Sequence, residues 1–197
     1  MNTMKNVTFI ILSIYFFSCA SSTIVTNDNT KTTTEKTTNK TSSAISGVQT
    51  QPKILVGKQD RKALEQAPYS KWFNTNYKEY KVDTKTVEQL KPYLKGITIK
   101  AFMGTWCSDS KRETPTFYKI LDQANYDYNN LELITVTRTK DTPKGYEKGL
   151  DIVRVPTFIF YKDGKELGRY VEFARETLEK DMLTITSEKP YKHSYQD

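Results

Sequence analysis

The stretch that decides the fold is Trp106-Cys107-Ser108-Asp109-Ser110. It follows an apolar run from Ile97 to Met103, which is typical of a buried strand, and it begins a segment with the spacing of an amphipathic helix. A cysteine at the start of a helix lies near unpaired backbone N–H groups and the positive end of the helix dipole, and both favour a thiolate. Three residues further on stands Ser110, not a second cysteine. Any sulfur chemistry at this position is therefore predicted to use one thiol.

The surrounding sequence predicts helices and strands in alternation. Residues 63–95 have helical spacing with a break at Pro68, and their aromatic side chains at positions 72 to 80 are expected to join the core. Further along, the pattern predicts a buried strand, a loop or short helix, a hairpin and a closing helix, at residues 131–137, 142–150, 157–171 and 175–185 respectively. Together these elements make an α/β architecture around a mixed sheet.

Three spaced markers between about Gly96 and Thr186 resemble the thioredoxin-like superfamily. They are Trp106-Cys107-x-x-Ser110, Pro115 eight residues past the cysteine, and Val155-Pro156-Thr157 just before the hairpin. The chain is most similar to the exported thioredoxin-like lipoproteins of bacteria, with their CxxC motif changed to CxxS. The resemblance implies a thioredoxin-like three-layer α/β/α sandwich with a mixed sheet, preceded here by a helical extension at residues 60–95.

The resemblance also implies a role for each residue of the site. Cys107 is the expected nucleophile, and Ser110 is expected to stabilise its thiolate through a hydrogen bond. The substrate-binding residues are expected to be Trp106, Val155 and Pro156. In the family the indole shields one side of the sulfur, and the residue before a cis proline pairs its backbone with an extended substrate strand.

Two parts of the dithiol machinery are absent from this sequence. Ser110 cannot attack a mixed disulfide, because a serine hydroxyl is neither acidic nor nucleophilic enough to cleave an S–S bond. Ala101 stands six residues before the cysteine, where thioredoxins place a buried carboxylate that moves protons. Turnover is therefore expected to need an outside thiol.

The charges around the cysteine oppose one another, and the sequence leaves the balance open. Asp109 disfavours a thiolate, whereas five cations expected near the same edge of the sheet favour it: Lys111, Arg112, Arg138, Lys140 and Arg154. The single histidine, His193, lies in a polar segment after Pro190. We therefore expect no Cys–His catalytic pair, no metal site and no cofactor.

The beginning of the chain has the composition of an export signal. Lys5 precedes an 11-residue apolar run, Val7 to Phe17, and Cys19 follows in a context that resembles a bacterial lipobox. The sequence thus predicts four parts: a signal peptide (1–19), a disordered Thr/Ser/Lys-rich tether (20–59), the folded domain (60–187) and a polar tail (188–197).

Two functions from different classes fit these features. The first is a monothiol protein that exchanges disulfides with envelope proteins or low-molecular-weight thiols through Cys107. The second is a redox-silent thioredoxin-fold module that binds an extended peptide. A lipid on Cys19 would place either one in the bacterial cell envelope, where the periplasmic side is expected. The net charge of +7 comes from scattered cations rather than a basic stripe, so no nucleic acid partner is expected.

Overall fold

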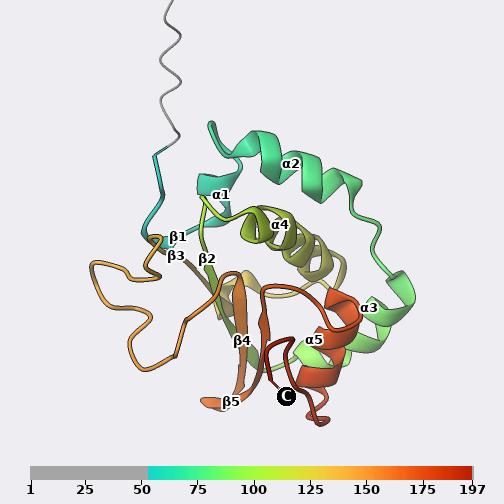
Figure 1. Cartoon of the computed structure of the whole chain (residues 1–197). Helices are drawn as coiled ribbons and strands as arrows, with labels where there is room; N and C mark the ends of the chain where they lie inside the picture. Colours follow the sequence, from blue (N-terminus) through green and yellow to red (C-terminus); the bar gives the residue numbers. More distant parts are fainter. Residues whose placement is uncertain (1–52, 197) are drawn as a thin grey trace, which may run out of the picture. The chain divides into compact units, whose positions relative to one another are not determined.

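This computed structural model describes residues 53–196 of the chain. These residues form a domain with a five-stranded mixed sheet (Figure 1). The strands are β1 (Gly57–Gln59), β2 (Ile97–Met103), β3 (Leu131–Thr135), β4 (Thr157–Lys162) and β5 (Lys165–Val171). The helices are α1 (Arg61–Leu64), α2 (Ser70–Glu79), α3 (Thr84–Leu90), α4 (Ser108–Gln123) and α5 (Leu178–Thr186). Two short 3-10 helices, η1 (Lys91–Leu94) and η2 (Tyr128–Asn130), lie directly after α3 and directly before β3. No helix within residues 53–196 has the length and apolar character that crossing a bilayer requires.

The strand order brings the two predicted motifs to one edge of the sheet. The strands follow the order β1-β3-β2-β4-β5, with β3 parallel to β2 and the other neighbours antiparallel. Phe102, near the end of β2, lies opposite Thr157, the first residue of β4. Because β4 runs against β2, the residues that follow β2 and those that precede β4 come together at this edge.

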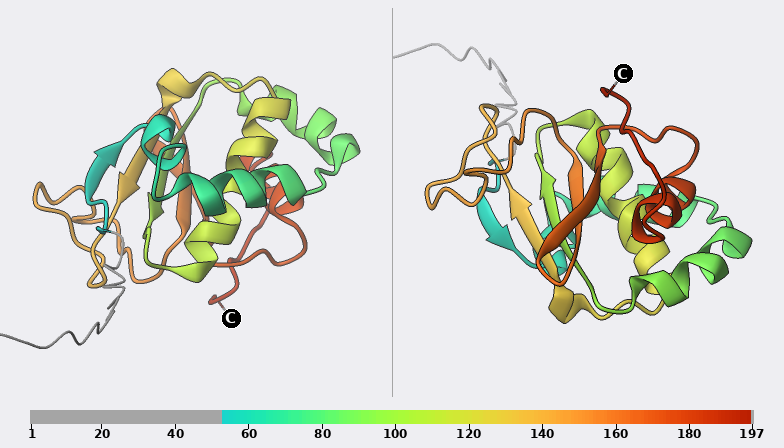
Figure 2. Two further views of the ribbon diagram at one scale, coloured as in Figure 1. Left: turned by 90° about the horizontal axis from the view of Figure 1, so that it is seen from above. Right: turned by 90° about the horizontal axis from the view of Figure 1, so that it is seen from below.

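The two faces of the sheet are covered differently. On one face, alternate residues of β2 such as Ile99 and Ala101 belong to a core cluster that also includes buried side chains of the helices, and Figure 2 shows the helices on that side. On the other face, Phe102 packs with Ile152 from the long connection between β3 and β4. Residues 136–156 contain no helix. A loop therefore forms the layer on this face of the sheet.

Most elements agree with the sequence predictions. The hairpin of β4 and β5 turns at residues 163–164, the predicted helical extension contains α1 to α3, and α5 is the closing helix. Phe73 is buried in the main core cluster. The side chains of Trp72, Tyr77 and Tyr80 pack against this cluster. The aromatic side chains at positions 72 to 80 are thus core residues, as predicted.

The predicted start of the domain at residue 60 is wrong. Residues 57–59, which were expected to belong to the tether, form strand β1, with Gly57 opposite Thr135 of β3. Lys58 also forms an ion pair of 2.5 Å with Glu132. Strand pairing at the edge of β3 orders a segment whose own composition shows no strand signal. The predicted signal peptide, Cys19 and the rest of the predicted tether up to residue 52 lie outside the described residues.

The segment after α5 packs against the domain. The Tyr191 hydroxyl donates a hydrogen bond of 2.9 Å to Asp181 of α5, and the Ser194 hydroxyl donates one of 2.8 Å to the Phe173 carbonyl. The residues predicted as a polar tail therefore follow the protein surface from α5 back to the end of β5.

Candidate active site

The connection from β2 to α4 places Cys107 at the start of the helix. Its backbone N–H donates a hydrogen bond of 3.0 Å to the Gly104 carbonyl, and its own carbonyl accepts one of 3.1 Å from Lys111. Cys107 is therefore the N-cap residue of α4, which begins at Ser108, and its backbone is extended. The cysteine thus lies at the positive end of a 16-residue helix.

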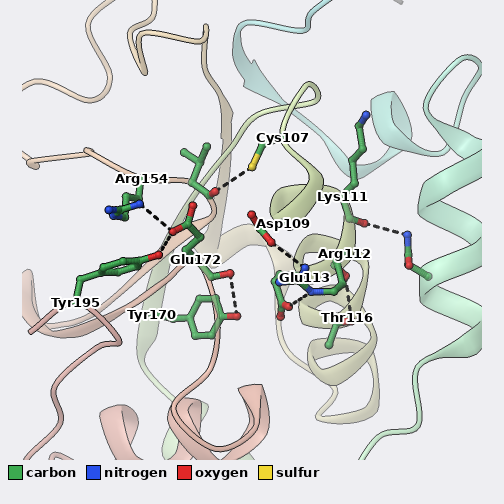
Figure 3. A network of polar contacts seen from close by, with 12 residues as sticks. Cys107, Asp109, Lys111, Arg112, Glu113, Thr116, Arg154, Tyr170, Glu172 and Tyr195 are labelled. Carbon is green, nitrogen blue, oxygen red and sulfur yellow. Dashed lines mark hydrogen bonds and ion pairs between the residues drawn. The ribbon is translucent and has the colours of Figure 1, made fainter.

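The thiol faces the residue before a cis proline. Cys107 is free and half-buried, and its Sγ donates a hydrogen bond of 3.2 Å to the Val155 carbonyl (Figure 3). The peptide bond between Val155 and Pro156 is cis. The structure therefore brings together three of the predicted site residues from positions nearly 50 residues apart in the chain.

Trp106 is fixed beside the thiol by two contacts. Its Nε1–H donates a hydrogen bond of 3.0 Å to the Val136 carbonyl, at the beginning of the long loop. Its indole also lies against Gly104, where an added Cβ would stand only 2.6 Å from a ring carbon. The position before Thr105 thus requires glycine, a contribution to the site that the sequence reasoning missed because no local pattern marks it.

The structure gives Ser110 a partner other than the predicted one. Its hydroxyl oxygen accepts a hydrogen bond of 3.1 Å from the Gly104 N–H, and no hydrogen bond joins it to the Cys107 sulfur. Ser110 is fully buried. A buried backbone N–H at the end of β2 needs an acceptor, and the serine supplies it. Ser110 therefore stabilises the loop that carries the cysteine.

The acidic residue next to the cysteine is paired. Arg112 forms ion pairs of 2.8 Å with Asp109 and 2.6 Å with Glu113. Burial disfavours the charge of this guanidinium, but the hydrogen bonds to the two carboxylates outweigh it and raise the pKa of Arg112. The negative charge of Asp109 is thus opposed by a cation on its own helix.

A cluster on the other side of the cis proline was not predicted. Arg154 lies 3.2 Å from Glu172 and 3.8 Å from the ring centroid of Tyr195, and the Tyr195 hydroxyl donates a hydrogen bond to Glu172 (Figure 3). That hydrogen bond raises the pKa of Tyr195. The tail thus reaches the residue that precedes Val155, and no feature of its polar sequence indicated this contact.

His193 does not join the cysteine. It lines a cavity of about 300 Å³ together with Arg169 and Tyr195, and burial, followed by the charge of Arg169, lowers its pKa. Within residues 53–196, no group of three or more His, Cys, Asp or Glu side chains is placed to hold a metal ion.

The fold and the site together define the class of protein. A thiol at the N-cap of the helix after a central strand, facing the residue before a cis proline, is the arrangement expected of a thioredoxin-like domain. The family model described as thioredoxin matches residues 57–187, and the chain belongs to this family. The predicted fold class, a thioredoxin-like α/β fold with a mixed sheet and an N-terminal helical extension, is confirmed; of the three predicted layers, the one on the face of Phe102 is a loop and not a helix.

Similar proteins cover part of the chain. The thioredoxin-like protein R548 of Acanthamoeba polyphaga mimivirus is 29% identical over 89 residues, which make up 45% of this chain and 62% of the relative. Thioredoxin H9 of Arabidopsis thaliana is 27% identical over 94 residues, or 48% of this chain and 63% of the relative. The chain therefore spans less than two thirds of the length of these relatives. A crystal structure of a protein of unknown function from Pseudomonas aeruginosa matches with 14% identity and a TM-score of 0.47, covering 66% of this chain and 81% of the other.

Proposed function

We propose that this chain is a monothiol protein of the bacterial cell envelope that exchanges disulfides through Cys107. The observation that carries this proposal is the position of the thiol: free, half-buried, at the N-cap of α4 and next to the cis proline. The names of both curated relatives, a thioredoxin-like protein and a thioredoxin, support thiol–disulfide chemistry.

The proposed reaction is one exchange step. The Cys107 thiol loses its proton and its sulfur attacks one sulfur of a partner disulfide. The partner S–S bond breaks, a disulfide between Cys107 and the partner forms, and the second partner sulfur leaves as a thiolate that takes up a proton. Ser110 is buried and carries no thiol, so an outside thiol must release the partner.

The test uses the full chain with Cys19→Ala in every sample, so that Cys107 is the only thiol. Mixed with the small neutral disulfide dithiodipyridine, the protein should release about one equivalent of pyridinethione and keep the other half bound, as expected for a single exchange. Cys107→Ser should release none. Insulin reduction driven by dithiothreitol should stay near background, and sustained turnover by this protein would contradict a monothiol mechanism.

A second variant tests whether the lack of a resolving thiol explains the low insulin reduction expected of the original protein. Ser110→Cys places a second sulfur three residues after the first, and we expect mild oxidant to join the two as a disulfide with a loss of about 2 Da. This variant should also gain some insulin reduction, although less than a dithiol enzyme because Ala101 offers no proton acceptor. Two free thiols after oxidation would show that residue 110 cannot reach Cys107.

One observation favours the alternative of a redox-silent binding module. The Cys107 sulfur donates to the Val155 carbonyl, and only a protonated thiol can make that hydrogen bond. If dithiodipyridine reacts with the urea-unfolded chain but not with the folded protein, the thiol is inert and the binding module is the better assignment.

The cell-envelope location is part of the same proposal and rests on the leader alone. The apolar run that ends at Phe17 and the lipobox-like context of Cys19 support lipidation and attachment to a membrane. The partners that follow are envelope proteins or low-molecular-weight thiols, held through a mixed disulfide.

A further inference from the structure

Two cations lie over the ring of Trp106, one residue before the thiol. The guanidinium carbon of Arg138 is 5.2 Å from the ring centroid, and the ammonium nitrogen of Lys140 is 6.0 Å from it. Both distances are within the range of a cation–π contact. The indole is itself held by the Val136 carbonyl, so the two cations lie over the residue that precedes Cys107 in the chain.

Neither cation has a carboxylate partner among residues 53–196. Asp141, the next residue after Lys140, accepts hydrogen bonds from the hydroxyls of Thr137 and Thr139. Asp109, on the helix side of the thiol, is paired with Arg112. The nearby acids are thus engaged with other groups.

Beside the cis proline, by contrast, the positive charge is balanced. Arg154 is paired with Glu172 at 3.2 Å and covered by the Tyr195 ring. The charge of Arg154 is therefore balanced by Glu172, whereas Arg138 and Lys140 have no carboxylate partner in the described part of the chain. A ligand that lies across the thiol meets uncompensated positive charge on the Trp106 side.

The residue whose carbonyl accepts the thiol hydrogen bond also carries a backbone donor. Val155 is only 2% exposed, and its N–H donates to no acceptor among residues 53–196. A buried backbone N–H without an acceptor is costly, so an acceptor from outside this part of the chain is favoured there. The carbonyl of an extended peptide segment supplies such an acceptor.

We propose that Trp106, Arg138 and Lys140 form a docking surface for an extended acidic polypeptide segment, which presents its sulfur to Cys107. The substrate class of the proposed function would then be acidic polypeptides. For the reaction at the sulfur, this inference rests on the proposed function. A polypeptide fits better than a nucleic acid, because it supplies a backbone carbonyl for the Val155 N–H, a sulfur for Cys107 and carboxylates for the two cations.

The experiment compares three peptides of equal length that differ only in charge. Each carries one cysteine joined to thiopyridine as a disulfide, flanked by acidic, neutral or basic residues. Cys107 attacks the peptide sulfur, the S–S bond to the pyridine sulfur breaks, and the released pyridinethione reports the rate. At low salt the acidic peptide should react about 3- to 10-fold faster than the neutral one, the basic peptide slowest, and added salt should reduce the difference.

Two charge variants separate the local effect from net charge. Arg138→Gln with Lys140→Gln should remove the preference for the acidic peptide. The matched control is Lys95→Gln with Lys165→Gln, which changes the net charge equally at the other end of the sheet, where Ile97, Lys162 and Lys165 are neighbours. A strand of this length spans roughly 20 Å, well beyond the Debye length of about 10 Å at 0.1 M salt, so the control should keep the preference.

The outcomes distinguish this inference from the proposed function. If the protein reacts with dithiodipyridine but shows equal rates with all three peptides, or if both charge variants lose the preference equally, the docking surface is wrong and the monothiol function stands. If Cys107 is inert, the binding of fluorescent versions of the same peptides to Cys107→Ser is measured instead. Tighter binding of the acidic peptide that is lost with Arg138→Gln and Lys140→Gln supports the docking surface. Equal binding of the three peptides overturns it. An oligonucleotide that displaces the acidic peptide at lower concentration than unlabelled peptide would also overturn it.

Discussion

At the scale of single residues, Ser110 and Gly104 hold the active-site loop together. The serine oxygen accepts the buried Gly104 N–H, and the missing side chain at 104 leaves room for the Trp106 indole. A CxxS motif is readily interpreted as a CxxC motif that has lost a thiol. In this fold the hydroxyl also has a structural task, since it satisfies a donor at the end of β2.

We expect Ser110→Ala to destabilise the protein by about 1–3 kcal/mol, because it leaves the buried Gly104 N–H without an acceptor. The matched control is Thr114→Val on the same helix, since the Thr114 hydroxyl is buried and has no hydrogen-bond partner among residues 53–196. Removing that hydroxyl should leave stability unchanged or raise it. Urea unfolding of the two variants checks the difference, and equal losses would contradict the role of Ser110.

At the scale of elements, α5 connects the helical extension and the tail to the core. Its buried Glu179 accepts hydrogen bonds of 2.8 Å from the Tyr80 hydroxyl and 3.1 Å from the Asp83 N–H, both near the N-terminus of α3. Its Asp181 accepts hydrogen bonds from Tyr191 in the tail and from the backbone of Arg175. One short helix thus anchors the helical extension and the tail with two buried carboxylates.

Asp181 makes stability depend on pH. Burial raises the pKa of Asp181 above its usual value, despite the hydrogen bonds that it accepts. The native state therefore binds a proton that the unfolded state has released, and the free energy of unfolding falls as pH rises from about 4 through the raised native pKa. Asp181→Asn removes this titration, so the free energy of unfolding of the original protein relative to that of the variant should decline as pH rises above about 4 in urea unfolding.

Asp83 supplies a control of opposite sign. Hydrogen bonds from the Thr86 hydroxyl and N–H lower the pKa of Asp83, so its contribution is complete above the unfolded pKa of about 4 and is lost as pH falls below it. The difference in the free energy of unfolding between the original protein and Asp83→Asn should therefore shrink only as pH falls below about 4. The same pH trend for Asp83→Asn and Asp181→Asn would contradict the assignment to Asp181.

At the scale of the whole molecule, the proposed anchor decides where the thiol can act. Metabolic labelling with a fatty acid should mark the full chain, and Cys19→Ala should abolish the label and release the protein from membranes. Cys107→Ser is the control, because it removes the other cysteine and should keep both the label and the membrane association. Label that persists in Cys19→Ala would refute lipidation at this residue.

The class of fold and the candidate nucleophile could be predicted from the amino-acid sequence alone. An apolar run, a cysteine at a helix start and a turn between two short strands are local patterns, and they predicted β2, α4 with Cys107 at its start, and the β4–β5 hairpin. The candidate residues Trp106, Val155 and Pro156 came from the resemblance to the thioredoxin-like superfamily. Local patterns suffice here because strand alternation, helix capping and turn chemistry depend on neighbouring residues.

The partners of these residues, in contrast, depend on how the chain folds in three dimensions. The Gly104 N–H donates to the Ser110 oxygen, and β3 pairs with residues 57–59 as a strand. Tyr195 from the tail lies against Arg154. The cations over Trp106 likewise come from a loop about 30 residues further along the chain. Apart from the contact between Gly104 and Ser110, these contacts join residues distant in sequence, and a buried donor or an unpaired charge selects its partner only after the chain has folded around it.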